Sequence, residues 1–243
     1  MGPVLLIQGI ESRAFIRYII HESSRMQRFS DRRDAGRQLA GKLSKYADRP
    51  DVIVLALPRG GVPIAYEVAQ AIQAPLDVMI VRKLGLPGEE ELALGAIASG
   101  GIRILNQDII DALAVSQMVI DRVTEREKAE LERRERQYRG ERPILEICDR
   151  TIILVDDGLA TGASMLAAVR ATRIRHPAQV VVAVPVASYQ AIYILRQEVD
   201  EVFCVRIPED FEGVGRWYED FSQTTDEEVR HLLENASRMP PAI

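Results

Sequence analysis

The stretch that decides the fold is TIILVDDGLATGAS, residues 151–164. Its first five residues are apolar or β-branched and predict a strand that is covered on both faces. Two carboxylates follow at once, Asp156 and Asp157, and a run of small residues then leads into a predicted helix over 162–174. A buried strand, a short loop and a helix in immediate succession indicate a parallel sheet with helices on both faces, which is an α/β fold.

The loop of this stretch predicts a phosphate-binding site. Its small or hydroxyl-bearing residues are Ala160, Thr161, Gly162, Ala163 and Ser164. Small side chains let backbone N–H groups approach an anion, and the positive end of the following helix adds to the attraction. Asp156 and Asp157 only accept hydrogen bonds, which suits sugar hydroxyls or a hydrated Mg²⁺. A phosphate beside a diol indicates a ribose 5-phosphate.

The alternative interpretation of the loop is a turn that is acidic and small without any ligand. Two adjacent aspartates at the end of a buried strand are costly to place unless a cation or a diol meets them. The ligand-binding interpretation is therefore favoured.

The segment resembles the signature of type I phosphoribosyltransferases that binds phosphoribosyl pyrophosphate (PRPP). The shared pattern is four hydrophobic residues, two acids, two further residues and an A-T-G-small-S/T loop, and the order of elements over about 29–207 is compatible with that fold. The resemblance implies that Asp156 and Asp157 hold the ribose hydroxyls, that residues 160–164 hold the 5-phosphate, and that Mg²⁺ is the cofactor. The two aspartates would contact Mg²⁺ directly or through water.

Two positions depart from the family's pattern. Gly158 stands where the family often has a β-branched residue, and Ala163 replaces a frequent glycine. Neither change removes a ligand group, and Gly158 is expected to loosen the loop.

A second loop supports the first. Arg59, Gly60 and Gly61 follow another buried strand, predicted over 51–57, and open a helix, so they could grip a second anion. Gly-Gly alone is more often an ordinary turn. In the family that the chain resembles, the corresponding loop holds pyrophosphate, and these three residues match its basic residue and glycine.

The rest of the pattern outlines the domain. A helix is expected from Ser30, and further strands over 77–81, 179–186 and 201–207. We expect residues 1–25 to be an extension of unclear role and 26–243 to be one phosphoribosyltransferase-like domain. Within it, an insertion or hood spans about 82–142 and a C-terminal cap about 208–243.

The hood is predicted to begin with a mobile loop, followed by short strands at 96–98 and 102–105. A charged helix over 107–140 loses its apolar stripe beyond Val123, which indicates an arm in solvent or a surface for a partner, and the solvated arm is favoured. The resemblance implies that the hood closes over PRPP, with Lys83 as the first candidate for a pyrophosphate contact and Arg82 as the second. Solvated charges at a strand end are the alternative, and the acidic run 89–91 is expected to be solvated.

The C-terminal segment holds the only tryptophan of the chain. Its aromatic residues are Trp217, Tyr218 and Phe221. They could line the acceptor pocket by stacking on a base, or form a hydrophobic clamp that seats the last helix. The clamp is favoured.

Composition narrows the function classes. The chain has 31 Lys+Arg against 36 Asp+Glu, a balance that argues against a dedicated nucleic-acid binder. Two distant cysteines and three scattered histidines give little support to a disulfide framework or a zinc site, and they favour a reducing cytoplasm. The longest uncharged run, 177–195, contains two prolines and is interpreted as strand, turn and helix rather than a membrane span.

These observations predict a phosphoribosyltransferase that binds PRPP and Mg²⁺ and displaces pyrophosphate from the anomeric carbon with a nitrogenous acceptor. The catalytic candidates are Arg59, Lys83, Asp156 and Asp157. Two alternatives stay open: a PRPP-sensing binding protein of the same fold without turnover, and an enzyme that acts on another sugar phosphate or nucleotide. The acceptor and any self-association are not readable from the sequence.

Overall fold

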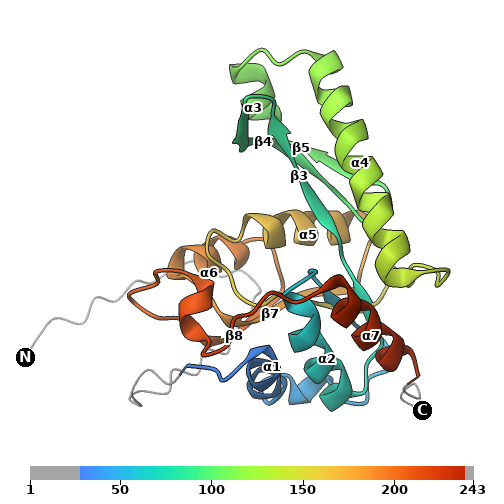
Figure 1. Cartoon of the computed structure of the whole chain (residues 1–243), viewed down its shortest axis with the longest axis vertical. Helices are drawn as coiled ribbons and strands as arrows, with labels where there is room; N and C mark the ends of the chain where they lie inside the picture. Colours follow the sequence, from blue (N-terminus) through green and yellow to red (C-terminus); the bar gives the residue numbers. More distant parts are fainter. Residues whose placement is uncertain (1–27, 239–243) are drawn as a thin grey trace, which may run out of the picture.

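Five parallel strands form the central sheet, in the order β2-β1-β6-β7-β8, in a computed structural model that describes residues 28–238 (Figure 1). The strands are β1 (Val52–Ala56), β2 (Leu76–Val78), β6 (Thr151–Val155), β7 (Gln179–Val186) and β8 (Glu201–Arg206). All residues of β1 and β6 are buried, as their continuous apolar runs predict. The predicted extension over 1–25 lies outside the described residues.

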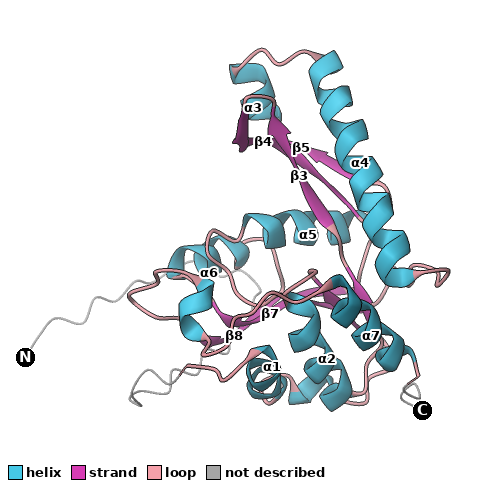
Figure 2. Ribbon diagram, in the orientation of Figure 1, coloured by secondary structure: helices cyan, strands magenta, loops and turns pink. Residues whose placement is uncertain are grey.

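Helices cover both faces of this sheet (Figure 2). On one face, α2 (Gly61–Ile72) packs on alternate residues of β1. Beside it, α1 (Arg32–Ala40) packs on α2, β7 and β8, and α7 (Asp226–Ser237) packs on α2 and β2. On the other face lie α5 (Ala163–Ile174) and α6 (Tyr189–Leu195). The predicted α/β class is thereby confirmed. The expected helix from Ser30 is α1, whose N-cap is Asp31: the Asp31 carboxylate accepts a hydrogen bond from the N–H of Asp34 at 2.7 Å.

A second sheet stands above the first. It contains β3 (Val81–Leu86), β4 (Glu89–Ala98) and β5 (Ile102–Leu105), all antiparallel. The prediction of a mobile loop at the start of this region is wrong, because β3 and β4 form a hairpin whose Leu84 and Leu94 are fully packed. In the sequence, Gly95 interrupts the apolar pattern of β4. It is needed because a side chain there would lie 2.1 Å from the carbonyl oxygen of Ile104 on β5.

The charged helix of this region is also different from the prediction. It is divided into α3 (Gln107–Ala112) and α4 (Gln117–Arg139), with Ala114 between them at φ 47°. One face of α4 is buried along its length, including Leu131 and Tyr138, so the helix is not an arm in solvent. At its foot, the Arg139 guanidinium donates to the buried Asp77 carboxylate of β2 at 3.0 Å. In the structure the hood consists of the elements β3 to α4, residues 81–139, compared with the expected range of about 82–142.

None of the helices within 28–238 combines the length and the apolar character needed to cross a membrane.

The close packing of α1 on α2 depends on Gly36. A methyl group at this position would lie 2.9 Å from both the carbonyl oxygen of Ile64 and the Cβ of Glu67. We therefore expect Gly36→Ala to lower the free energy of unfolding by about 1–3 kcal/mol. Urea denaturation measures the change. Gly41→Ala at the end of the same helix is the matched control, since its nearest neighbour is 3.5 Å away, and it should stay within about 0.5 kcal/mol of the unmodified chain. Equal losses for both variants would contradict the packing argument.

Candidate functional site

The parallel pairing of β1 with β6 brings the two predicted loops together. Ala56 of β1 is opposite Val155 of β6, so both strands end at the same level. The contact beyond them is very close, because a methyl group at Gly60 would lie 1.9 Å from Oδ2 of Asp157. One at Gly61 would lie 2.7 Å from the carbonyl oxygen of Val155. Position 61 therefore needs glycine, because backbone atoms block a side chain, and a side chain at position 60 would require the Asp157 carboxylate to move.

Asp156 and Asp157, the acidic pair, are both half-buried. Oδ1 of Asp156 accepts a hydrogen bond from the N–H of Asp157 at 2.8 Å. Burial, and secondly the neighbouring Asp157 carboxylate, raise the pKa of Asp156 well above its usual range. Burial also raises the pKa of Asp157, although the nearby Arg32 acts in the opposite direction. Because ionising both carboxylates is costly here, the site favours a cation or hydroxyl donors as its ligand.

Arg32 is a site residue that the sequence did not reveal. Its Nε and Nη2 atoms, on α1, donate to Oδ2 of Asp157 at 3.0 and 2.8 Å. Its Nη1 donates to the backbone oxygen of Ser222 at 2.7 Å. Two further arginines, Arg33 and Arg37, lie on the same short helix. No spacing or motif distinguishes Arg32 from these neighbours.

The predicted phosphate-binding loop is anchored by hydrogen bonds to its backbone, whereas its hydroxyl side chains are exposed. Its anchors are the N–H of Leu159, which donates to the backbone oxygen of Val186 at 3.0 Å, and the hydroxyl of Ser188, which donates to the backbone oxygen of Ala160 at 2.6 Å. Gly162 adopts φ 75° and α5 begins at the next residue. The side chains of Thr161 and Ser164 are exposed at the start of the helix. The N-terminal end of α5 is thus open to an anion.

Gly158 is explained by its neighbour. A methyl group at Gly158 would lie 2.5 Å from Cγ1 of Val214 and 3.0 Å from Cγ1 of Val186. The side chain of Val214, from the C-terminal segment, fills the space beside Gly158. The glycine therefore leaves no gap, because Val214 occupies the volume that a side chain at position 158 would take.

The C-terminal aromatic residues form a clamp, but not on the last helix. Tyr218 pairs with Phe29 as an isolated β-bridge, and these two residues pack with Trp217 and Val186. The segment therefore packs against Phe29, near the start of the described residues, and against the acidic loop. The hydroxyl of Tyr218 donates to the backbone oxygen of Asp157 at 2.6 Å, while Phe221 lies under the Arg32 guanidinium at 4.0 Å. We call residues 213–222 the strap.

Arg59 faces the start of the last helix rather than solvent alone. Its guanidinium is 3.8 Å from the carboxylate of Asp226 at the start of α7, and both side chains are about one-third exposed. The same carboxylate accepts hydrogen bonds from Tyr138 and Gln137 of α4. Asp226 thus joins the second loop, the hood and the last helix.

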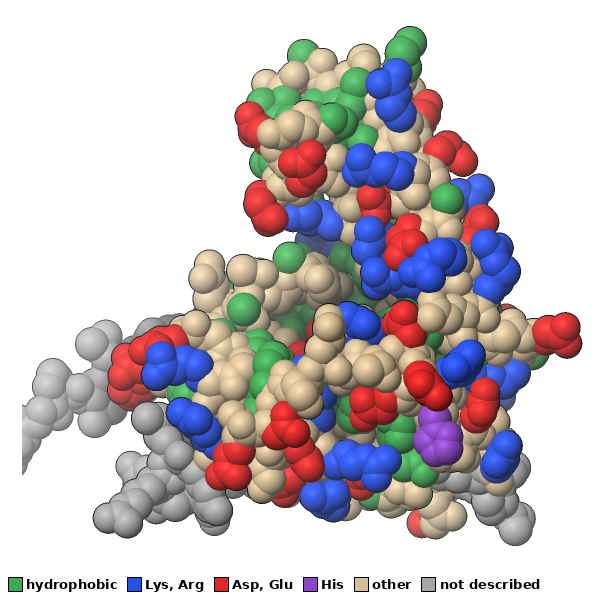
Figure 3. Space-filling view, in the orientation of Figure 1, with side chains coloured by type: hydrophobic (Ala, Val, Ile, Leu, Met, Phe, Trp, Pro, Cys, Tyr) green, Lys and Arg blue, Asp and Glu red, His purple; other side chains and the backbone are tan. Residues whose placement is uncertain are grey.

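The two basic candidates of the hood point to different partners. Arg82 donates twice to the Glu127 carboxylate of α4, at 2.9 and 2.6 Å, which engages it in the hood's own packing. Lys83 is more exposed and donates to Glu91 within the hairpin. Both bond within the hood and not to the loops at 59–61 or 156–164. Residues 89–91 are exposed, as expected of a solvated run. Figure 3 shows basic side chains along the notch that separates the hood from the core.

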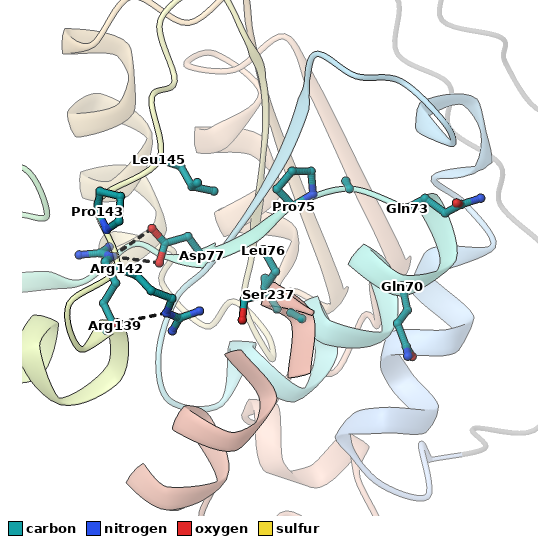
Figure 4. Close-up of a pocket in the computed structure, with 12 residues that line it drawn as sticks. Gln70, Gln73, Pro75, Leu76, Asp77, Arg139, Arg142, Pro143, Leu145 and Ser237 are labelled. Atoms are coloured by element: carbon teal, nitrogen blue, oxygen red, sulfur yellow. Dashed lines mark hydrogen bonds and ion pairs between the residues drawn. The ribbon is translucent and has the colours of Figure 1, made fainter. Parts of the chain in front are cut away.

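A pocket of about 560 Å³ lies elsewhere, between β2, the foot of α4 and the end of α7 (Figure 4). None of the predicted site residues lines it. Its charged groups already have partners, because Arg139 bonds to Asp77 and Arg142 donates to the backbone oxygens of Leu233 and Tyr138. The pocket's polar groups thus belong to the packing of α4 on the core.

The comparisons with known proteins agree with this geometry. A family model described as a phosphoribosyl transferase domain matches residues 27–220. Two curated proteins from strains of Mycobacterium tuberculosis, both provisionally named phosphoribosyl transferases, are 43% identical over 213 residues. That alignment covers 88% of this chain and 48% of each relative, so the chain spans about half the length of the curated relatives it matches.

A solved structure is similar over the whole domain. The crystal structure of TT1426 from Thermus thermophilus aligns with a TM-score of 0.77 and 42% identity, covering 86% of this chain and 99% of the other. The family model alone extends over most of the described residues, including both loops of the site. The chain therefore belongs to the phosphoribosyltransferase family.

Proposed function

We propose that this chain binds PRPP together with Mg²⁺ and transfers its phosphoribosyl group to a nitrogenous acceptor, releasing pyrophosphate. One observation carries the proposal: the Arg59–Gly61 loop and the acidic pair approach so closely that Gly60 has no room for a side chain beside Asp157. A ligand whose sugar diol lies next to a pyrophosphate would span both loops.

The cysteines Cys148 and Cys204 are free thiols, which supports a cytoplasmic location.

The residues of the site fit Mg²⁺ as an ion that enters with its substrate. Mg²⁺ usually keeps several waters and binds one or two carboxylates plus substrate phosphates. Asp156 and Asp157 supply such carboxylates, directly or through water, and the described residues contain no cluster of three or more acidic, histidine or cysteine side chains suited to a metal. Bound beside the pyrophosphate, Mg²⁺ would neutralise charge on the leaving group.

The chain's own groups would divide the work of the reaction. Asp156 and Asp157 would accept hydrogen bonds from the ribose hydroxyls, while the loop at 160–164 holds the 5-phosphate. The bond from the anomeric carbon to the pyrophosphate oxygen breaks and a carbon–nitrogen bond forms, through an oxocarbenium-like state. Arg59, with Lys83 when the hood closes, would stabilise the departing pyrophosphate. Positioning and electrostatic stabilisation supply most of the rate in such chemistry.

A thermal-shift titration tests the proposal directly. PRPP is compared with ribose 5-phosphate, AMP and pyrophosphate, each with and without Mg²⁺. Binding to the folded state alone at ~100 times Kd stabilises by roughly 2.7 kcal/mol, so a shift that is largest for PRPP with Mg²⁺ supports the proposal. A shift for another phosphate but none for PRPP would overturn it. Release of pyrophosphate across a panel of nitrogenous acceptors then separates an enzyme from a PRPP-sensing protein.

Asp156→Asn is expected to weaken binding and raise stability. The amide keeps an oxygen for the N–H of Asp157 but loses the charge, so PRPP affinity should fall roughly tenfold to a hundredfold. Because the folded state raises the pKa of Asp156, this group favours folding below its unfolded pKa of about 3.9 and loses that contribution as pH rises. The ligand-free variant should therefore melt at a higher temperature than the unmodified chain at pH 8, with a difference that shrinks toward pH 4.

Asp210→Asn, at an exposed loop position, is the control and should change neither quantity. Calorimetry measures the affinities and melting curves the stability. A variant that is less stable at pH 8 would contradict the assigned cost of burying the Asp156 charge.

Arg59→Met tests the second loop. Since the ion pair with Asp226 is long and partly exposed, its loss should lower stability by less than about 1 kcal/mol. Affinity for pyrophosphate and for PRPP should fall roughly tenfold or more, because a charged hydrogen-bond donor is removed. Affinity for ribose 5-phosphate should stay unchanged.

The matched control is Arg103→Met, which removes a hood arginine of similar exposure and a comparable surface ion pair. Isothermal titration of the three ligands gives the comparison. Equal losses for ribose 5-phosphate and pyrophosphate would show that Arg59 does not act on the pyrophosphate.

A further inference from the structure

Arg32 contacts the acidic pair in an unequal way. Both of its hydrogen bonds to Asp157 end on the same oxygen, Oδ2, at 3.0 and 2.8 Å. Neither uses Oδ1. Oδ2 is also the atom that lies closest to the space beside Gly60, so this oxygen is packed between α1 and the Arg59–Gly61 loop. The ion pair thus fixes one side of the carboxylate and leaves the other side to a ligand.

Arg32 is itself held by three different groups. Besides Asp157, its Nη1 donates to the backbone oxygen of Ser222 at 2.7 Å, and its guanidinium lies 4.0 Å from the ring centre of Phe221. Its side chain is only 11% exposed. A planar guanidinium can satisfy all three at once, whereas a lysine ammonium would supply a point charge without the stacking surface. Arg32 is therefore a fixed part of the site and not a mobile surface charge.

The charge of Arg32 meets a specific need. Asp156 and Asp157 are consecutive and half-buried, and a nearby cation reduces the repulsion between two such carboxylates. Among the described residues, Arg32 is the cation that forms an ion pair with either of them. Its neighbours Arg33 and Arg37 point instead toward Glu67 of α2.

We propose that Arg32 is a positioning residue for sugar recognition, which holds Asp157 by Oδ2 so that Oδ1 is presented to a ribose hydroxyl. This inference rests on the proposed function and adds a residue from outside both loops. Arg32 acts through Asp157, so its removal should weaken every ligand that carries the ribose diol. The affinity for ligands that lack the sugar should not change when Arg32 is replaced.

Isothermal titration of the full chain with PRPP, ribose 5-phosphate and pyrophosphate tests the inference. Arg32→Met should weaken PRPP and ribose 5-phosphate by about tenfold or more, while pyrophosphate stays within about twofold. The affinities of Arg32→Lys for PRPP and ribose 5-phosphate should lie between those of Arg32→Met and the unmodified chain, because lysine restores the charge but not the planar pair of hydrogen-bond donors. In an Asp157→Asn background, adding Arg32→Met should change affinity by less than about twofold, since the group it positions is already impaired. Arg33→Met is the matched control on the same helix turn and should leave all affinities unchanged.

The outcomes separate this inference from the proposed function. An unmodified chain that binds no PRPP overturns the proposed function, and the inference with it. An unmodified chain that binds PRPP, with Arg32→Met binding equally well, overturns the inference alone. A loss that persists in full in the Asp157→Asn background, or that is equal for pyrophosphate, also overturns it, because Arg32 would then act on the structure in general. Melting curves identify any variant that fails to fold, and Arg32→Lys then carries the same comparison of sugar-bearing ligands with pyrophosphate.

Discussion

The parallel pairing of β1 with β6 is the constraint on which the rest of the site depends. It ends two buried strands at one level, and the loops that follow are forced into close contact at Gly60 and Asp157. Contact this close leaves no room for a side chain at position 60, so in the proposed function a ligand would be recognised by backbone groups and by the residues at the edge of the two loops. Arg59, Asp156 and Asp157 stand at that edge because the sheet places them there.

Much of the central fold was predictable because its signals are local. The bounds of β6 and β7 follow from continuous apolar runs, and the acidic loop follows from a motif that lies within 14 residues of sequence. Arg32 was not predictable, since it meets Asp157 from 125 residues away and sits in a helix rich in arginine. Contacts of this kind depend on how α1 packs, which no spacing in the chain encodes.

The hood shows a different reason for error. The charge of α4 suggested a solvated helix, yet Glu127 and Arg139 are buried because each finds an opposite charge, Arg82 and Asp77 respectively. Ion pairs take the places that apolar side chains fill in an ordinary amphipathic helix, so the hydrophobic stripe disappears from the sequence while the buried face remains. The hairpin was missed for a related reason, because Gly85 and Gly95 serve close strand contacts rather than flexibility.

The packing of Val214 against Gly158 links two segments that a motif search treats as separate. The strap fills the place where a side chain of the acidic loop would stand, and its Tyr218 hydroxyl bonds the backbone of that same loop. Grafting the loop of a relative with a β-branched residue at position 158 into this chain would collide with Val214. The loop and the strap of this chain are therefore complementary in shape, and a larger residue at position 158 requires a change at position 214 as well.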